Sequence, residues 1–528
     1  MLDMLIINGT IIDGSGTPAF KGCVGVKDGK ITAANGSLEA VQVIDASGKI
    51  VCPGFIDAHS HGDKILGTED GRLFKTAQGI TTELCGNCGS MRAPISSERT
   101  DQIRNYYSIP EPIEEVKKWS LFENYLRYAE SLQLSANVRF YAGHNILRMS
   151  AMGLDNRPAS SKDMDNMRSM LREAMEAGSA GLSTGLIYTP GCFSEPEEII
   201  ELAKVIAPFN GIYGSHMRNE SFALTESVKE VIDVGKAAGV RLNISHYKVM
   251  GKSNWGNYRE SYELIQNAND NGMHITCDQY PYTRNMTNLY PCMPPWYFSD
   301  GKSAMANRLK DRSFREKVRK EMEDPSTNFD NFYLNSGGWD GVYISYAPKN
   351  PESEGLYVTE YADKIGNDPW NAYFDLMVEN ECLGDGVYST MCEDDLCDII
   401  KAPFCVVGTD GYTMSWKNKG HPRASSSFPH AINYFVKEKG VLSLEQMINK
   451  MTGLTAERLM IANKGLIREG YDADIVILDY DNLKVLSTYS DPNRKTEGID
   501  YVIVGGKIVY KDLDFTGTYS GKVIRYNK

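Results

Sequence analysis

Short apolar segments alternate with longer segments of helical pattern through the middle of the 528-residue chain. Eight apolar segments, each long enough for one buried strand, lie at residues 50–57, 79–84, 138–142, 181–184, 211–215, 242–245, 274–277 and 404–407. Between two of them, residues 162–177 place methionine, leucine and alanine at helical spacing, which is more typical of a core-facing helix than of a cofactor site. Strands that alternate with helices favour a parallel sheet, and eight of them predict an α/β fold closed as a (β/α)8 TIM-like barrel.

The two ends of the chain have a different pattern from the middle. Short β-branched runs end at Asn8-Gly9 and Asp28-Gly29 near the N-terminus, and similar runs recur after Asp474, so both ends are predicted to be β-rich. Residues 284–341 interrupt the alternation with a proline-rich stretch, a charged helical pattern and Asn/Gly-rich linkers. We therefore expect an inserted subdomain there, after the seventh strand.

The composition is that of a soluble globular enzyme, with 42% hydrophobic and 24% charged residues. The sequence has 56 basic and 69 acidic residues, and the resulting net charge of −13 without a basic block disfavours nucleic acid as a partner. The N-terminal apolar run is too short for a signal peptide, and no stretch approaches the ~20 apolar residues that cross a membrane. The 11 cysteines are scattered and do not resemble a disulfide framework. We expect a reduced, cytoplasmic protein without a membrane partner.

Five of the eight histidines follow predicted strands: His59, His61, His144, His216 and His246. Barrel enzymes build their active sites at this end of the strands. Residues i and i+2 of an extended segment point to the same side, so His59 and His61 can reach one metal ion. A His-x-His pair alone is a weak signal, but histidines at several equivalent strand ends together predict a metal centre.

The second and eighth predicted strands end in further candidates. The Cys85-x-x-Cys88 pair is open to three interpretations: a redox motif, half of a zinc ribbon, or two structural cysteines. No second pair completes a ribbon, and zinc accepts mixed sulfur and nitrogen ligands, so Cys88 is a candidate ligand beside the histidines. Asp410 is either a turn or helix cap or, because its strand would neighbour the first strand in a closed barrel, a member of the same site.

A competing motif occurs in the fourth predicted strand. Residues 181–185 read Gly-Leu-Ser-Thr-Gly, which matches the nucleophile elbow of serine hydrolases. That motif requires a helix directly after the serine, whereas the residues that follow Ser183 have the pattern of a loop. We therefore do not expect a serine mechanism.

The sequence resembles the amidohydrolase superfamily and, within it, the D-aminoacylases (N-acyl-D-amino-acid deacylases). The resemblance covers nearly the whole chain, and its specific motifs are residues 55–61, 86–89 (Gly-Asn-Cys-Gly), 185–188 (Gly-Leu-Ile-Tyr), 216–220 (His-Met-Arg-Asn-Glu), 245–248 (Ser-His-Tyr-Lys), 280–283 (Tyr-Pro-Tyr-Thr) and 408–411 (Gly-Thr-Asp-Gly). It implies a small β-sandwich formed by residues 1–50 and 464–528, and a metal-dependent hydrolase barrel at residues 51–463 that carries the insertion.

The resemblance also implies roles for individual residues. Cys88, His216 and His246 would hold a tightly bound zinc ion, and His59 and His61, with Cys88 and Asp410, would form a second, weaker metal position. The substrate carboxylate would be bound by Lys248, Arg423 and Tyr188, with Tyr280 or Tyr282. The sequence departs from the family pattern at Gly62, which precedes Asp63 where the family has two acidic residues, and at Thr409, where the family often has serine.

These assignments predict zinc-dependent hydrolysis of N-acyl-D-amino acids, small-molecule substrates that yield a carboxylate and a free D-amino acid. Asp410 would act first as general base and then as general acid on the leaving amine. Two alternatives remain: another amidohydrolase activity on cyclic amides or dipeptides, and a non-catalytic dihydropyrimidinase-like scaffold. Loss of any metal ligand would favour the scaffold, and every candidate ligand is present. A homo-oligomer is compatible with the sequence.

Overall fold

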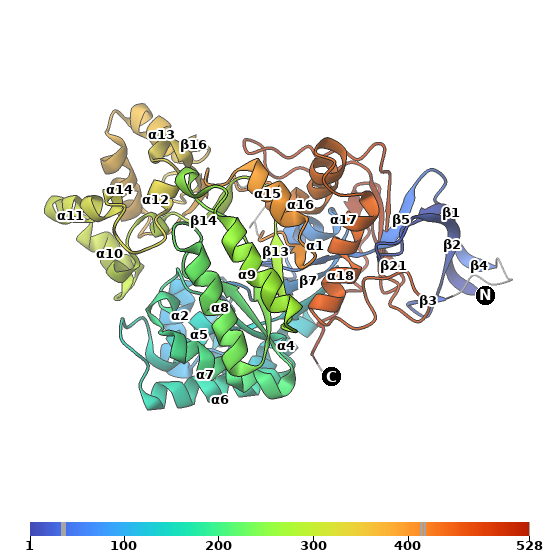
Figure 1. The fold of residues 1–528 in the computed structure, drawn as a ribbon, viewed down its shortest axis with the longest axis horizontal. Coiled ribbons are helices and arrows are strands. Elements are labelled where there is room, and N and C mark those ends of the chain that lie inside the picture. The colour runs from blue at the N-terminus through green and yellow to red at the C-terminus, as the bar shows by residue number, and fades with distance from the viewer. Residues whose placement is uncertain (33–38, 412–415, 417–418, 527–528) are drawn as a thin grey trace.

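The computed structural model describes residues 1–32, 39–411, 416 and 419–526 (Figure 1). Six parallel strands form one sheet, in the order β18-β13-β12-β11-β10-β9. Their bounds are β9 (Ala142–Gly143), β10 (Gly181–Gly185), β11 (Ile212–His216), β12 (Arg241–Ile244), β13 (Ile275–Gln279) and β18 (Cys405–Val407). The mixed α/β fold is thereby confirmed, and five of the predicted strands appear here in chain order.

A second parallel sheet contains β6 (Phe55–Asp57), β7 (Ile80–Cys85) and β8 (Asn137–Phe140). Hydrogen bonds join both of its edges to the six-stranded sheet. The Ala58 amide, just after β6, donates to the carbonyl of Val407, the last residue of β18, at 3.3 Å. The Ala180 amide, just before β10, donates to the carbonyl of Phe140, the last residue of β8, at 2.8 Å. The carboxyl ends of the strands of both sheets therefore lie on the same side of the structure.

The predicted strand at residues 50–57 is two strands in the structure. Its first half, β5 (Ile50–Pro53), pairs with the terminal sheet, and its second half is β6. The chain passes from one sheet to the other at Gly54, where a Cβ atom would lie 2.2 Å from the Thr81 hydroxyl oxygen. Only glycine allows this close approach, so a continuous apolar run is divided between two sheets.

Helices follow most of these strands. Their bounds are α1 (Glu69–Thr76), α2 (Thr100–Tyr106), α3 (Ile113–Val116), α4 (Phe122–Ser131), α5 (His144–Met152), α6 (Ser161–Ala177), α7 (Pro196–Ile206), α8 (Leu224–Ala238), α9 (Tyr258–Asp270), α15 (Glu393–Ile400), α16 (Arg423–Ala431), α17 (Leu444–Met451) and α18 (Gly453–Arg458). Helix α6 begins at a capping box of Ser160 and Asp163 and buries Met167 and Met175 in the main core. The methionine pattern is thus confirmed as core.

The two ends of the chain share one sheet. Its order is β22-β21-β20-β19-β5-β1-β2-β3, with β4 paired to β1. The strands are β1 (Leu2–Ile11), β2 (Phe20–Lys27), β3 (Lys30–Thr32), β4 (Ala40–Asp45), β19 (Ile475–Leu478), β20 (Ile499–Val504), β21 (Lys507–Lys511) and β22 (Asp514–Phe515). Antiparallel pairing of β19 with β5 joins the C-terminal strands to the N-terminal ones. The β-rich ends predicted from the sequence are present.

The segment after β13 builds a separate small sheet and core. The sheet order is β14-β17-β15-β16, with β14 (Asn285–Asn288), β15 (Val342–Tyr346), β16 (Leu356–Tyr357) and β17 (Asp385–Tyr388). Helices α10 (Lys302–Arg308), α11 (Arg312–Glu323), α12 (Phe332–Asn335), α13 (Val358–Ile365) and α14 (Pro369–Glu379) lie in the same segment, at the left of Figure 1. Residues 285–388, hereafter the inserted segment, therefore extend beyond the predicted range of 284–341. The sequence pattern of a helix such as α13 or α14 does not show which sheet it packs against, so the prediction ended before these helices.

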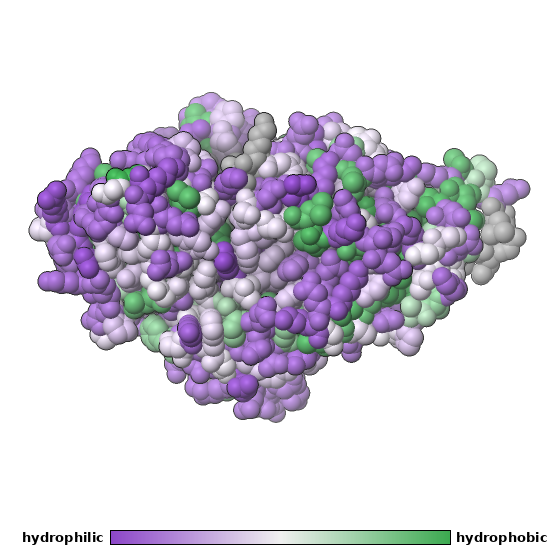
Figure 2. Space-filling model, turned by 90° about the horizontal axis from the view of Figure 1, so that it is seen from above, coloured by the Kyte–Doolittle hydropathy of each residue, from purple (hydrophilic) through white to green (hydrophobic). Residues whose placement is uncertain are grey.

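The surface in Figure 2 is mostly hydrophilic, with apolar side chains gathered toward the end built by β1–β4. Val41 and Val43 of β4 and Phe20 of β2 are exposed there. Among the described residues no helix combines the length and apolar character needed to cross a membrane. All 11 cysteines are free thiols in the structure.

Candidate active site

The loop after β7 carries Cys88 in a strained backbone conformation. Its φ is 55°, and Gly86 and Gly89 on either side also have positive φ. A Cβ atom on Gly89 would lie 2.9 Å from both the Gly185 nitrogen and the Asn145 Oδ1. Gly86 and Gly89 thus allow the loop that carries Cys88 to lie against the neighbouring strand end.

Ser183 of β10 fixes this loop. Its hydroxyl donates to the Gly86 carbonyl and accepts the Gly89 amide at 3.1 Å. No helix follows Ser183 directly, because α7 begins only at Pro196. The serine is buried and positions the Cys88 loop, which agrees with the expectation that it is not a nucleophile.

Two groups of ligand-type side chains share Cys88. One contains His59, His61, Cys88 and Asp410, and the other contains Cys88, His216 and His246; the donor atoms of each group lie within 4.8 Å of one another. Cys88 Sγ is 3.4 Å from the Nε2 atoms of both His59 and His246. All six residues are buried. The six metal-ligand candidates of the sequence are thus brought together.

The chemistry of these donors suits zinc. Burial raises the pKa of the Cys88 thiol, but His59 and His246 outweigh burial and hold this pKa well below its usual value, which favours the thiolate. Neither ring nitrogen of buried His216 has a hydrogen-bond partner among the described residues. Since buried imidazole nitrogens are normally satisfied, the orphaned ring and the thiolate fit a metal ion.

Two carboxylates orient the histidine rings. Asp278, at the end of β13, has its Oδ1 3.1 Å from His59 Nδ1 and also accepts the His246 amide at 2.8 Å. Glu220 Oε1 lies 2.9 Å from His246 Nδ1. Carboxylates behind metal-binding histidines fix the tautomer and the ring orientation. Neither carboxylate was among the site residues predicted from the sequence, although Asp278 follows the seventh predicted strand just as Asp410 follows the eighth.

Asp410 faces both His61 and Arg423. Its Oδ1 is 3.2 Å from His61 Nε2, and its Oδ2 is 2.7 Å from Arg423 Nη1. Burial raises the pKa of this carboxyl, but the Arg423 guanidinium and the His246 imidazole reverse that effect and hold the pKa well below its usual range. The backbone of Asp410 has φ 46°, as strained as that of Cys88. Strained residues of this kind often mark functional sites.

The predicted substrate-binding residues divide into two sets. Lys248, Arg423, Tyr188 and Tyr280 line the same cavity as the ligand candidates. Lys248 Nζ lies 2.6 Å from Glu220 Oε2, and the Arg423 guanidinium lies over the Tyr280 ring at 4.9 Å. Tyr282 does not line the cavity. It packs against the rings of His421 and His430, at 5.0 and 4.7 Å between centroids.

His144 also lies outside the site. Its Nε2 is 2.8 Å from Glu198 Oε1, and Arg148 bonds the same carboxylate. This buried cluster fastens α5 to α7. Four of the five strand-end histidines therefore converge, and the fifth forms a structural ion pair.

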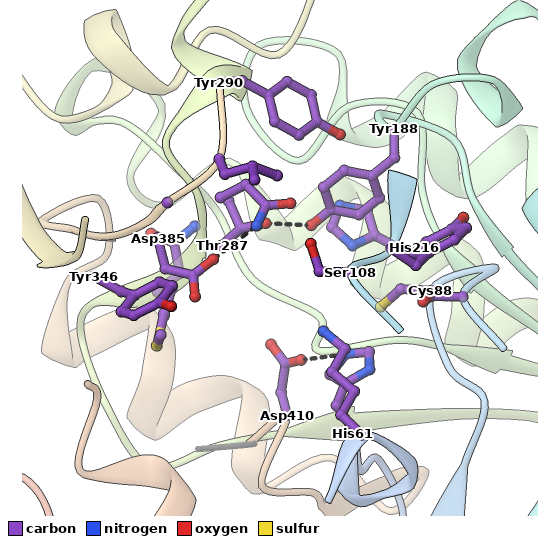
Figure 3. A pocket seen from close by; sticks show the side chains of 18 of the residues that line it. His61, Cys88, Ser108, Tyr188, His216, Thr287, Tyr290, Tyr346, Asp385 and Asp410 are labelled. Carbon is purple, nitrogen blue, oxygen red and sulfur yellow. Dashed lines mark hydrogen bonds and ion pairs between the residues drawn. The ribbon is translucent and has the colours of Figure 1, made fainter. Parts of the chain in front are cut away.

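The cavity has a volume of about 360 Å³. Figure 3 shows His61 and Asp410 on one side, Cys88 and His216 on another, and Tyr346 and Asp385 of the inserted segment opposite Cys88. The Tyr188 hydroxyl lies 2.8 Å from Thr287 Oγ1, a contact between a strand-end loop and the inserted segment. The cavity is thus lined by the strand ends and closed by the inserted segment.

Comparisons with known proteins identify a single family. The sequence profile described as "Amidohydrolase family" matches residues 42–207 and 399–510. D-aminoacylase of Alcaligenes xylosoxydans xylosoxydans is 30% identical over 99% of this chain and 97% of that protein. N-acyl-D-glutamate deacylase of the same organism is 31% identical over 96% of this chain and 94% of its own length.

One solved structure is similar to this chain over the whole length of both proteins. The crystal structure of N-acyl-D-glutamate deacylase from Bordetella bronchiseptica, complexed with zinc and a phosphonate inhibitor that mimics the tetrahedral intermediate, has a TM-score of 0.83 at 30% identity. The match covers 99% of both chains, so it includes the inserted segment.

Proposed function

The chain belongs to the amidohydrolase family and, within it, to the D-aminoacylases, and from this premise we propose that it hydrolyses the amide bond of N-acyl-D-amino acids. The products are a carboxylate and a free D-amino acid. The observation that carries the proposal is the convergence of Cys88, four histidines and Asp410 in one buried cluster. The same premise makes the protein a hydrolase acting on linear amides.

The architecture belongs to this proposal as well. The hydrogen bonds at both edges of the β6-β7-β8 sheet support a closed (β/α)8 barrel at residues 51–463. The sheet shared by the chain ends supports a β-sandwich formed by residues 1–50 and 464–528. The inserted segment, which follows β13, would be the subdomain that closes the cavity.

Cys88, His216 and His246 would hold one zinc ion tightly, with Glu220 behind His246. His59 and His61, with Cys88 and Asp410, would form a second and weaker position. Zinc bound at such a site supplies electrophilic polarisation of the scissile carbonyl and of the attacking water. The shared thiolate explains how two positions can lie side by side.

Asp410 would move the proton. Its low pKa keeps the carboxylate ionised and able to accept the proton of the attacking water. The same carboxyl would then return the proton to the amide nitrogen, because an amine anion is a very poor leaving group. His61, at 3.2 Å, and Arg423, at 2.7 Å, fix the orientation of the carboxylate.

Arg423 and Lys248 would bind the substrate carboxylate, with Tyr188 and Tyr280 as neighbours. Arg423 Nη1 faces Asp410 and Nη2 donates to the Met286 carbonyl at 2.8 Å, while the buried Nε has no hydrogen-bond partner among the described residues. The planar guanidinium can bind one carboxylate while it contacts another. Lys248 is paired with Glu220 and also donates to the His246 carbonyl at 3.1 Å, and it would contribute its third hydrogen. Tyr282 is a weaker candidate than Tyr280, because it lies outside the cavity.

The two alternatives are less well supported. A non-catalytic scaffold would not need six buried ligand-type residues within reach of one another. Cyclic amides such as hydantoins lack a free carboxylate, and they would leave Arg423 without its proposed partner.

The test is a deacylation screen. N-acetyl-D- and N-acetyl-L-amino acids should be compared with a hydantoin and a dipeptide, using the zinc-loaded protein and Asp410→Asn as the matched control. We expect turnover of D-substrates only. Hydrolysis of the hydantoin or the dipeptide in preference to every N-acetyl-D-amino acid would overturn the proposal.

A further inference from the structure

Several cations line the cavity, and three of them have defined partners. Lys248 pairs with Glu220, and Arg423 pairs with Asp410. Arg92 pairs with Glu111 and also donates to the backbone carbonyls of residues 63 and 64. These three charges are therefore compensated within the protein.

Lys302 is different. It is the first residue of α10 in the inserted segment and lines the same cavity. No carboxylate of the described residues lies within ion-pair distance of its ammonium, and no hydrogen bond joins it to any of them. Its nearest defined contacts are two aromatic faces, with Nζ 4.7 Å from the Tyr106 ring centroid and 5.0 Å from the Tyr290 ring centroid.

Two aromatic faces stabilise an ammonium but do not neutralise it. Burial lowers the pKa of Lys302 to about 8, although Asp385 and Cys382 oppose the shift. A half-buried cation without an ion-pair partner costs free energy, and charged side chains are seldom retained there without one. The cavity therefore contains a cation that no carboxylate of the described residues pairs directly, although Asp385 of the same cavity acts on it from a longer distance.

The position of this charge relative to the reaction centre follows from the aromatic side chains. The Tyr188 ring lies 5.0 Å from the His216 ring. Figure 3 shows Tyr290 beyond Tyr188, on the side away from Cys88 and His216. Lys302 lines the same cavity and has its ammonium over the Tyr290 ring, so its charge is offered to a part of a substrate remote from the ligand cluster.

We propose that Lys302, held between Tyr106 and Tyr290, binds a second carboxylate of the substrate, remote from the scissile amide. This inference rests on the proposed deacylase function and specifies its substrate class as dicarboxylic N-acyl-D-amino acids. Overall sequence similarity does not select this class, since the D-aminoacylase and the N-acyl-D-glutamate deacylase are 30% and 31% identical to the chain. The positive charge of Lys302 in the cavity favours this class.

The second carboxylate has two sources that share one chemistry. It belongs either to the side chain of an acidic D-amino acid or to a dicarboxylic acyl group. A cation binds both alike, so substrate pairs that differ only in this charge distinguish them. For the side chain, the pair is N-acetyl-D-glutamate and N-acetyl-D-glutamine. For the acyl group, the pair is N-succinyl-D-alanine and N-butyryl-D-alanine.

The experiment measures kcat and KM for both pairs with the zinc-loaded wild type, Lys302→Met and Lys302→Arg. Lys310→Met, which changes an exposed lysine of the same segment, is the control. We expect the wild type to prefer the charged member of one pair. Lys302→Met should lower kcat/KM for that substrate by about tenfold or more, mainly through KM, and Lys302→Arg should restore part of the loss. The uncharged member and the zinc content should change little.

Equal kcat/KM for charged and uncharged members of both pairs in the wild type would overturn the inference. So would an equal loss on both members in Lys302→Met, because that result indicates a structural role. In both cases turnover of the uncharged D-substrates would leave the proposed function intact. Absence of turnover with every N-acyl-D-amino acid would instead overturn the proposed function and this inference together.

Discussion

The guanidinium of Arg423 lies 2.7 Å from the carboxylate of Asp410. The two residues are proposed for different tasks, substrate binding and proton transfer. The ion pair makes these tasks physically connected, because a change at Arg423 also removes a positive charge from the neighbourhood of Asp410. Variants of either residue should therefore be measured for both kcat and KM.

Arg423→Ala should lower kcat/KM for N-acyl-D-amino acids by about tenfold to a hundredfold, since a charge-assisted contact is lost. Zinc content should stay unchanged, as Arg423 is not a ligand candidate. Steady-state kinetics and metal analysis on one preparation test this. Arg423→Lys is the control that keeps the charge but not the planar fork. An unchanged kcat/KM in Arg423→Ala would mean that other residues bind the carboxylate.

Asp410→Asn should retain the fold and the zinc bound by Cys88, His216 and His246. Its kcat should fall by about 10²–10⁴-fold, because asparagine cannot accept and return a proton. If Asp410 served only as a turn residue, asparagine would replace it well, since both tolerate positive φ. Near-normal turnover of a zinc-loaded variant would thus refute the proton-transfer role.

Cys88→Ala should lose the tightly bound zinc. The expectation follows from the thiolate that both ligand groups share. Metal analysis after extensive dialysis provides the measurement, and Cys85→Ala is a matched control, because Cys85 is a buried cysteine three residues away that belongs to neither group. A full equivalent of zinc in dialysed Cys88→Ala would exclude Cys88 as a ligand.

Glu220→Gln should weaken zinc binding by about 10–100-fold, the usual effect of losing a carboxylate behind a ligating histidine. Glutamine keeps the shape but cannot compensate the charge of Lys248, which lies 2.6 Å from Glu220. Competition with a zinc chelator measures the affinity. Glu226→Gln, at an exposed position of α8, is the control. Equal affinities of the two variants would contradict an orienting role for Glu220.

The preference for a second carboxylate should depend on pH. Burial lowers the pKa of Lys302 to about 8, so its ammonium loses the proton as the pH rises through that value. Asp385 and Cys382 raise this pKa, and Lys64 lowers it. KM for the charged substrate should therefore increase between about pH 7 and 9 relative to KM for its uncharged analogue. A constant ratio across this range would contradict the expectation.

The sequence predicted those features of the fold and the site that depend on a local sequence pattern. All eight strand positions were found because buried strands between helices are short apolar runs. The ligand candidates were found because chemically distinctive residues follow those runs. Asp278 and Glu220 were missed since a carboxylate becomes informative only when its histidine partner is known. Lys302 was missed for a similar reason: its lack of an ion-pair partner among the described residues is a property of the assembled cavity.

The inserted segment has its own sheet and its own core, while the metal-ligand candidates lie at strand ends outside it. Amino-acid replacements within residues 285–388 can therefore reshape one wall of the cavity while the strand ends that carry Cys88 and the histidines stay unchanged. Asp330 is an exception, because its carboxylate accepts the Glu220 amide at 2.9 Å and so supports the carboxylate behind His246. The metal-ligand candidates and this one wall of the cavity are therefore encoded in separate stretches of the gene. Diversification within such a family can then proceed by variation of one stretch, and exchange of this segment between relatives is a direct route to new substrate preferences.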